Sequence, residues 1–462
     1  MEQAEPGPVK MPSPGKISPM VGFMLLLAGI NSVINAVLLF CTSQTCAWQL
    51  AVWYSRMIAY NDSWELMNHA LEYLHSPAVR QMFNDRTVYD VIFFAQRLKF
   101  QYPTTSLLFL EPLRLVHGGL TVPNALLNLI SWWTILAFIL VTVAIFILRM
   151  KTPAGGSVPA GRRDTAAAVL LLLLLISTFS LLFESFVLGQ IQSLLNLLFA
   201  AVILFRMRRQ PVPAGIFLGV MCAIKPNLVY FILWGLIRRE WRFVATFTCT
   251  LALFAGASVY FYGWGNTVDY LRVVGYISGR GESIYGNQSV NGLLNRLLFN
   301  GPNLGWEERR FAPYHPAVAV GTVLSSALLV IAGLWKRRNV SGRDGEIADF
   351  VLSALCFVMA SPIVWGHHYG ILLPVFAYLI PAAFDESPSG EKYLRRNVWL
   401  CGIAFILLSN TFDFLNALAD TRFNVLQSYR FFGALTLAVY LGIYSLRSGK
   451  QASAEAALPS GL

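Results

Sequence analysis

Charged residues are scarce in this chain. Asp, Glu, Lys and Arg make up 13% of its 462 residues, about half the share usual in soluble domains. Apolar runs near the length of a bilayer crossing recur instead, as in AAAVLLLLLLISTFSLLF at 166–183, and mean hydropathy is +0.56. These features exclude a soluble globular protein and predict an all-α polytopic membrane protein.

Several chemical signatures are also missing. The sequence has no metal-ligand spacing, no glycine-rich phosphate loop and no Asp-x-Asp motif of the kind that holds a nucleotide sugar's divalent metal. We therefore expect no metal and no cofactor. Cysteines number only six, and Cys41 and Cys46 follow the first apolar segment closely enough to pair on an oxidising side of a membrane.

The net charge of +11 does not indicate a nucleic-acid partner, because Lys and Arg occur in short clusters between apolar runs. Such clusters are typical of the cytoplasmic ends of membrane helices. With these clusters inside, both termini are cytoplasmic. We expect a Pro-rich tail at 1–17, one transmembrane domain at 18–447 and a second tail at 448–462.

This orientation predicts about twelve membrane segments. Residues 211–237 lie between two basic clusters and contain Lys225-Pro226, so we expect two half-helices that meet at Lys225. The other crossings are expected at 18–40, 125–149, 165–183, 188–206, 243–262, 316–335, 347–364, 369–384, 397–415 and 428–446.

Long segments remain on the extracytoplasmic side, at about 41–124 and 263–315, with a short bend at 365–368. Loops of this length are usually functional. Within the first, DSWELMNHALEYLH (62–75) has apolar residues at helical spacing, which predicts an amphipathic helix lying on the membrane. A simple lid over the helices is the alternative.

Polar residues gather on this same outer side. A carboxylate, amides, a cation and imidazoles at one boundary can bind a polar headgroup that carries a lipid tail. Each has a plainer alternative: Lys225 can extend to the interface, Asp62 can cap a helix, and the His pair can sit in wet interface. The residues are Asp62, Glu65, Glu184, Gly189, Gln190, Gln192, Lys225, Asn287, Gln288, His367 and His368.

Four motifs in order resemble glycosyltransferase family 87, whose members use polyprenyl-phosphate sugars. The resemblance spreads over most of 60–375. It is carried by FQYPTTSLLFLEPL (100–113), LGQIQSLLNLLFAAVILFRMRRQPVPAGIFLGVMCAIKPNLVYFILWGLIRREWR (188–242), NQSVNGLLNRLL (287–298) and SPIVWGHHYGILLP (361–374).

The resemblance implies a type-C glycosyltransferase-like fold in a cell membrane, that of the bacterial inner membrane, with an extracytoplasmic active site. Its catalytic Asp lies in a large first outer loop, where Asp62 is the best match. The implied partners are a polyprenyl-phosphate hexose, notably mannose, a glycolipid or glycan acceptor, and membrane lipid. Expected donor-binding residues are Gln190, Lys225, Asn287, Gln288, His367 and His368.

Three departures from the family pattern leave the sugar and acceptor open. Gly189-Gln190-Ile191-Gln192 replaces Gly-Gln-x-Asn, Thr104 follows Tyr102-Pro103 where a second Pro is common, and Gly366 replaces an acidic residue before the His pair. The last departure predicts that the imidazoles lack an orienting carboxylate.

The expected chemistry needs a base for the acceptor hydroxyl and cations for the departing phosphate. Asp62 supplies the base, and Lys225 with the His pair supplies the cations. A mechanism with two flanking carboxylates is disfavoured because Glu65 lies one turn further along the same helix. The alternatives are a transporter or flippase for lipid-linked glycans, and a ligase or polymerase that moves a whole glycan.

Overall fold

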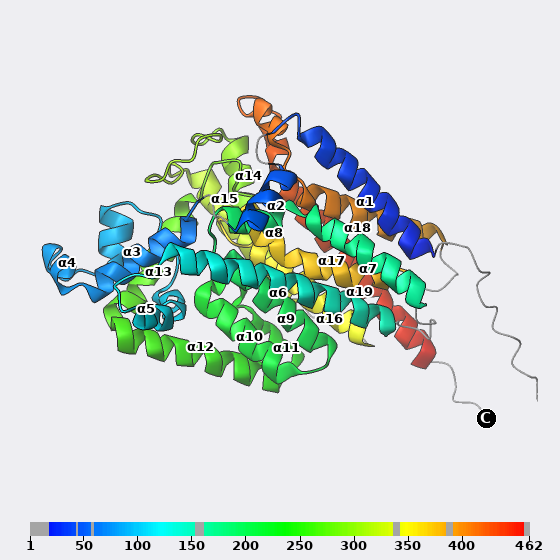
Figure 1. Ribbon diagram of the computed structural model, residues 1–462, viewed down its shortest axis with the longest axis horizontal. Helices are drawn as coiled ribbons and strands as arrows, with labels where there is room; N and C mark the ends of the chain where they lie inside the picture. The colour runs from blue at the N-terminus through cyan, green and yellow to red at the C-terminus, as the bar shows by residue number, and fades with distance from the viewer. Residues whose placement is uncertain are drawn as a thin grey trace, which may run out of the picture.

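Apolar segments in lipid must satisfy their backbone groups internally, so helices are the expected element. The computed structural model describes residues 18–42, 45–56, 60–152, 161–335, 342–384 and 391–456. Every regular element in these ranges is a helix, and the one bridge of β type joins Asn287 to Trp365. The long helices run side by side and the shorter loop helices gather at one end (Figure 1).

Four of the described helices are long and apolar enough to cross a membrane: α1 (Pro19–Leu38), α6 (Asn124–Lys151), α12 (Trp241–Tyr262) and α15 (Pro316–Leu334). A fifth candidate joins α7 (Arg162–Ser177) to α8 (Ser180–Val187) across a 45° bend. The figure of about twelve segments stays a prediction. The helix α9 (Gln192–Met207) and the apolar part of α18 (Glu391–Ser409) are shorter.

The predicted break at Lys225 is present. Helix α10 (Pro211–Ile224) ends there, and Lys225 is extended before the short η3 (Pro226–Leu228) and α11 (Phe231–Arg238). Pro disfavours helical geometry in the residue before it. Residues at the start of α10 and at the end of α11 line one common cavity, so the two half-helices form a hairpin with Lys225 near its tip.

Glycines bring this hairpin close to α12. A Cβ atom on Gly215 would lie 2.2 Å from Oγ1 of Thr246, and one on Gly219 would lie 2.7 Å from Cβ of Thr250. Small residues four apart allow such close backbone approach between membrane helices. The position of Lys225 is therefore set by tight packing between α10 and α12.

The first outer loop is mostly helical. It contains α2 (Cys46–Ser55), α3 (Asp62–His75), α4 (Pro77–Met82), the π-helix η1 (Tyr89–Ala95), η2 (Thr104–Phe109) and α5 (Glu111–His117). Cys41 and Cys46 are both free, and Cys46 Sγ lies 3.3 Å from the carbonyl oxygen of Ser177. The disulfide that their spacing allows is therefore not formed.

Helix α3 has the bounds predicted for it, but its apolar face does not lie on the membrane. Trp64, Met67, Leu71 and Leu74 are all buried within the protein core. An apolar stripe at helical spacing indicates that something covers the helix, and here protein covers it. The expectation of a membrane-surface helix is therefore wrong.

The second outer segment holds α13 (Trp264–Arg280) and α14 (Val290–Leu297). After it come α16 (Gly342–Met359), η4 (Gly366–Leu372) and α17 (Leu373–Ala382), then η6 (Asp413–Leu418), η7 (Asn424–Ser428) and α19 (Tyr429–Ala456). Every residue of α17 is buried. A helix that is apolar all round belongs in the interior, so the core lies around α17.

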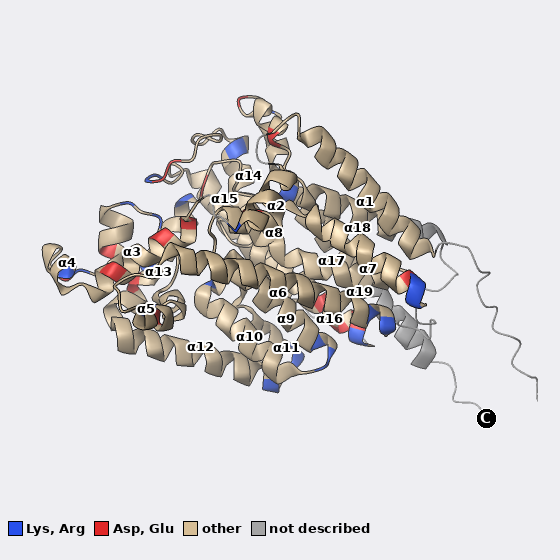
Figure 2. Cartoon of the chain, viewed as in Figure 1, with Lys and Arg blue, Asp and Glu red and all other residues tan. Residues whose placement is uncertain are grey.

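Charge is distributed unevenly along the helices. Figure 2 shows Lys and Arg gathered where α7 begins and α11 ends, whereas Asp and Glu gather around α3, α5 and α13. The predicted tail 1–17 lies outside the described residues, as do residues 457–462 of the tail predicted at 448–462. Helix α19 continues past residue 447 to Ala456, so the boundary predicted there falls within a helix.

Candidate active site

The first turn of α3 is attached to the turn between α8 and α9. The backbone N–H groups of Asp62 and Ser63 donate to the carbonyl oxygens of Leu188 and Gly189, at 3.0 and 3.3 Å. These N–H groups have no partner inside the helix, so the contact satisfies them. Gly189 has φ 64°, a conformation that suits glycine. The outer loop thereby brings Asp62 to a fixed place.

The Asp62 carboxylate is held by Gln190. Gln190 Nε2 donates to Asp62 Oδ2 at 2.9 Å. The hydroxyl groups of Ser63 and Tyr102 lie 2.5 and 3.2 Å from Gln190 Oε1, which directs Nε2 toward Asp62. The residue at the cap position of α3 is Asn61 rather than Asp62. The alternative that Asp62 only caps the helix is therefore wrong.

The environment of Asp62 suits a proton acceptor. Its side chain remains exposed, although the surrounding protein desolvates it. Desolvation raises the pKa of Asp62 above its ordinary value, while the hydrogen bond from Gln190 opposes that rise. A carboxylate with a raised pKa is a stronger base, and an exposed one can be reached by an acceptor hydroxyl.

Lys225 and His368, which come from two of the sequence motifs, contact each other. Nζ of Lys225 and Nε2 of His368 lie within hydrogen-bond distance, and the backbone N–H of Trp365 donates to His368 Nδ1 at 3.2 Å. Lys225 Nζ also lies 6.0 Å from the centre of the Tyr102 ring. Tyr102 therefore links the Asp62 side of the site to the Lys225 side.

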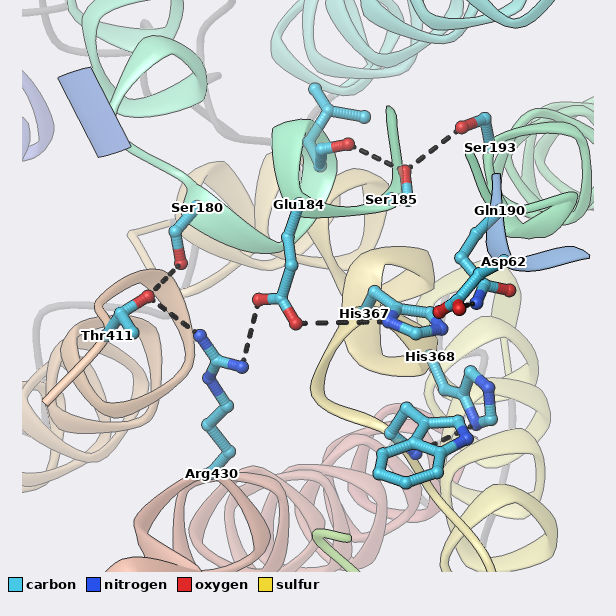
Figure 3. A network of polar contacts seen from close by, with 12 residues as sticks. Asp62, Ser180, Glu184, Ser185, Gln190, Ser193, His367, His368, Thr411 and Arg430 are labelled. Atoms are coloured by element: carbon cyan, nitrogen blue, oxygen red, sulfur yellow. Dashed lines mark hydrogen bonds and ion pairs between the residues drawn. The ribbon is translucent and has the colours of Figure 1, made fainter. Parts of the chain in front are cut away.

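His367 lies between Asp62 and Glu184 (Figure 3). Its ring stands at 83° to that of His368, with centroids 4.9 Å apart. Nδ1 is 3.8 Å from Glu184 Oε1, and among the described residues neither ring nitrogen has a hydrogen-bond partner. Buried imidazole nitrogens are normally satisfied, so His367 has unused capacity to bind a ligand.

Glu184, the carboxylate beside His367, forms an ion pair with the buried Arg430. Arg430 Nη1 lies 3.0 Å from Glu184 Oε2. A Cβ atom on Gly366 would lie 2.0 Å from Arg430 Nη1, so only glycine leaves room for this guanidinium. The prediction that the imidazoles lack a carboxylate is wrong, because α8 supplies Glu184 to His367.

Arg430 and Tyr102 were not among the predicted site residues. Arg430 is the second residue of α19 and the one charged residue of the apolar run 429–446, so it could have been recognised as a candidate from the sequence. Tyr102 belongs to the motif FQYPTTSLLFLEPL (100–113), but no role was predicted for it. Glu65, by contrast, is exposed, and its Oε1 lies 3.9 Å from Nε2 of His69.

Asn287 and Gln288 have structural contacts rather than open amides. Each makes two hydrogen bonds from its side-chain nitrogen to backbone carbonyls: Asn287 to Glu282 and Pro362, Gln288 to Tyr285 and Gln427. The Asn287 side chain also accepts from the N–H of Val364 at 3.0 Å. These hydrogen bonds join the second outer segment to the bend that carries the His pair. A direct contact of the two amides with the donor stays a prediction.

A small cavity of about 20 Å³ lies beside Lys225 and His368, with Gln192 and Asn227 in its wall. It has room for about one water-sized group. Gln192 reaches it from α9 and donates to Asn196 at 3.0 Å. A cation, an imidazole and amides around such a space can hold an oxygen atom of a phosphate.

An exposed carboxylate thus lies near a cation and a His pair, in a bundle with membrane-length helices. The sequence model of Glycosyltransferase family 87 matches residues 100–362, which is more than half of the chain. The chain belongs to this family, and its membership confirms the resemblance carried by the motifs. Asp62, the His pair and Arg430 lie outside the matched range.

Two curated relatives carry the description polyprenol-phosphate-mannose-dependent alpha-(1-2)-phosphatidylinositol mannoside mannosyltransferase. The one from Mycobacterium tuberculosis is 28% identical over 195 residues, covering 41% of this chain and 41% of that protein. The one from Mycolicibacterium smegmatis is 26% identical over 205 residues, covering 42% and 41%. The matched part therefore spans less than half the length of each relative.

Proposed function

We propose that this glycosyltransferase moves a hexose, mannose in the first instance, from a polyprenyl-phosphate donor to a hydroxyl of a glycolipid or glycan acceptor. The family and the names of the relatives support this donor class. The observation that carries the proposal is the connected arrangement of Asp62, Gln190, Tyr102, Lys225 and His368. In this arrangement the carboxylate of Asp62 lies on one side of Gln190 and Tyr102, and the cation Lys225 lies on the other.

The reaction is a single displacement. Asp62 takes the proton of the acceptor hydroxyl as its oxygen bonds to the anomeric carbon. The bond from that carbon to the phosphate oxygen breaks, and the lipid phosphate leaves with the electron pair. Lys225 and the His pair stabilise the charge that develops on it. One displacement at the anomeric carbon inverts its configuration.

Glu184 is less suited to act as the base. It is held by Arg430 at 3.0 Å and shares its other oxygen with His367 at 3.8 Å. A carboxylate paired with an arginine is stabilised in its charged form and is a weaker base. Its proposed role is to orient His367 toward the donor phosphate.

The active site is proposed to face away from the cytoplasm. Asp62 lies on α3, at the end of the molecule opposite to the gathered arginines of α7 and α11 (Figure 2). Basic residues favour the cytoplasmic ends of membrane helices. A lipid-linked donor suits that compartment, because a polyprenyl phosphate carries its sugar within the membrane.

The test is reconstitution of the full chain in liposomes with polyprenyl-phosphate mannose and a set of glycolipid acceptors, followed by mass spectrometry of the lipids. We expect one hexose to be added to an acceptor, and much slower addition by Asp62→Asn. Movement of intact donor across the bilayer without a product would indicate a transporter instead. Addition of a whole glycan would indicate a ligase or polymerase.

A further inference from the structure

A second cavity, of about 740 Å³, lies at the end of the molecule opposite to Asp62. It is formed where α9 and α11 end and where α10 and α12 begin, with α16 contributing to its wall. Its size is that of a small-molecule site. Five arginines line it: Arg206, Arg209, Arg238, Arg239 and Arg242.

Two of these arginines are neutralised. Arg206 binds both carboxylate oxygens of Glu240, and Arg238 binds both oxygens of Asp349, at 2.6 and 2.9 Å. Paired in this way, they form the rigid wall of the cavity. Such two-point contacts fix the guanidinium planes.

The other three arginines have no acidic partner among the described residues. Arg209, Arg239 and Arg242 are exposed, and Glu346 is the one lining carboxylate without a described ion pair. The cavity therefore carries a positive surplus. Planar guanidinium groups converging on one space are suited to phosphate.

Two tryptophans complete the wall. Trp234 is buried, Arg206 and Arg238 lie over its ring at 5.4 and 4.6 Å, and its indole N–H has no hydrogen-bond partner in the described part of the chain. Trp241, at the start of α12, is 61% exposed. An exposed tryptophan at a helix end is typical of the membrane–water interface.

We propose that this cavity binds the phosphate-bearing headgroup of an anionic phospholipid from the leaflet at the basic end of the molecule. Arg209, Arg239 and Arg242 bind the phosphate, and Trp241 contacts the boundary between headgroup and acyl chains. Basic pockets between membrane helices are suited to anionic headgroups. This assignment does not depend on the proposed transfer reaction.

The position of the cavity gives the lipid a structural effect. Arg209 precedes α10 and Arg239 follows α11, so one headgroup joins both ends of the hairpin that carries Lys225 near its tip. A bound headgroup therefore holds the two half-helices together at their bases. It stabilises the folded protein in proportion to its occupancy.

The test measures binding of phosphatidylglycerol and phosphatidylcholine to the full-length protein by native mass spectrometry, with thermal unfolding as a second readout. The variant is Arg209→Gln/Arg239→Gln/Arg242→Gln. The control is Arg162→Gln/Arg163→Gln, which removes charge at the same end of the molecule but outside the cavity. We expect the first variant to bind phosphatidylglycerol about 100-fold more weakly, and the control to bind it nearly as the parent does.

If the triple variant does not fold, the single variant Arg242→Gln is used instead. We expect it to bind phosphatidylglycerol about fivefold more weakly than the parent does. Equal loss in the control and the cavity variants would show a diffuse charge effect and overturn the proposal. So would equal binding of the two lipids by the parent. Thermal protection by inorganic phosphate matching that by phosphatidylglycerol would assign the site to a soluble anion instead.

Discussion

The side-chain nitrogen of Gln190 lies 2.9 Å from Oδ2 of Asp62 and joins residues 128 positions apart in the chain. The contact anchors a residue of the outer loop to the turn between α8 and α9. It also opposes the desolvation that raises the pKa of the carboxylate. The Gln190 amide therefore influences both the orientation of the Asp62 carboxylate and its basicity.

Asp62→Asn is expected to lower turnover about 10²- to 10⁴-fold, because asparagine has nearly the same shape but cannot accept the proton. Binding of the donor lipid should be unchanged. Glu65→Gln is the matched control and should have a mild effect, since Glu65 is exposed, lies 3.9 Å from His69 and stands one turn along α3 from Asp62. The rate of sugar transfer is measured in single-turnover assays. Full activity in Asp62→Asn would show that another residue is the general base.

Gln190→Leu is expected to move the acidic limb of kcat/KM to higher pH. The Gln190 hydrogen bond lowers the pKa of Asp62, so its loss raises that pKa further. Asp62 must be deprotonated to act, so activity is then lost at a higher pH as the medium is acidified. Ser63→Ala, which leaves the bond from Gln190 to Asp62 intact, should shift the limb less. If the acidic limb of kcat/KM does not move in Gln190→Leu, the group that titrates there is not Asp62.

His367→Ala, His368→Ala and Lys225→Met are each expected to raise the donor KM or lower kcat, with little change in the acceptor KM. The reason is that these groups face the departing phosphate rather than the acceptor. Steady-state kinetics with each substrate varied in turn separates the two effects. If the His variants turn over like the parent, the pair only fills the interface.

Gly366→Ala is expected to destabilise the protein by about 1–3 kcal/mol and to lower activity, because its Cβ would displace the Arg430 guanidinium from Glu184. The control is Gly279→Ala in α13, where an added Cβ meets nothing within 4 Å. Thermal unfolding and transferase activity are measured on both. Equal behaviour of the two variants would show that Arg430 adapts freely.

Single cysteines at Ala78 and Gly305 are expected to react with an impermeant thiol reagent from outside intact cells, and one at Gly161 is not. All three positions are exposed, and Gly161 lies next to the basic start of α7. The exposed native Cys41 and Cys249 are first replaced by serine. The reverse labelling pattern would place Asp62 in the cytoplasm.

The positions of helices could be predicted well because apolar runs and Lys225-Pro226 determine them locally. The bounds of α3 followed from its spacing, but the pattern could not say whether lipid or protein covers the apolar face. The number of crossings rests on charge clusters, which say nothing of short helices such as α9. The hydrophobic pattern describes each segment separately, whereas the burial of a residue depends on which segments pack against one another.

The sequence likewise predicted some residues of the candidate site and not others. Asp62, Lys225 and the His pair stood out because polar residues are costly near apolar runs. The link from Glu184 to Arg430 could not be predicted, since the two residues come from distant helices and meet through the space left by Gly366. Likewise, residue type could not show that the side-chain amides of Asn287 and Gln288 donate hydrogen bonds to backbone carbonyls.

The complete burial of α17 has a consequence for biogenesis. With 10 residues the helix is about 15 Å long, half the thickness of the hydrocarbon layer. It cannot be stably inserted as an independent span during synthesis. It packs against α6, which precedes it in the chain, and against α18, which follows it. We therefore expect α17 to be fully covered only after α18 has emerged, and a ribosome stalled directly after α17 to yield a chain that quality-control proteases degrade.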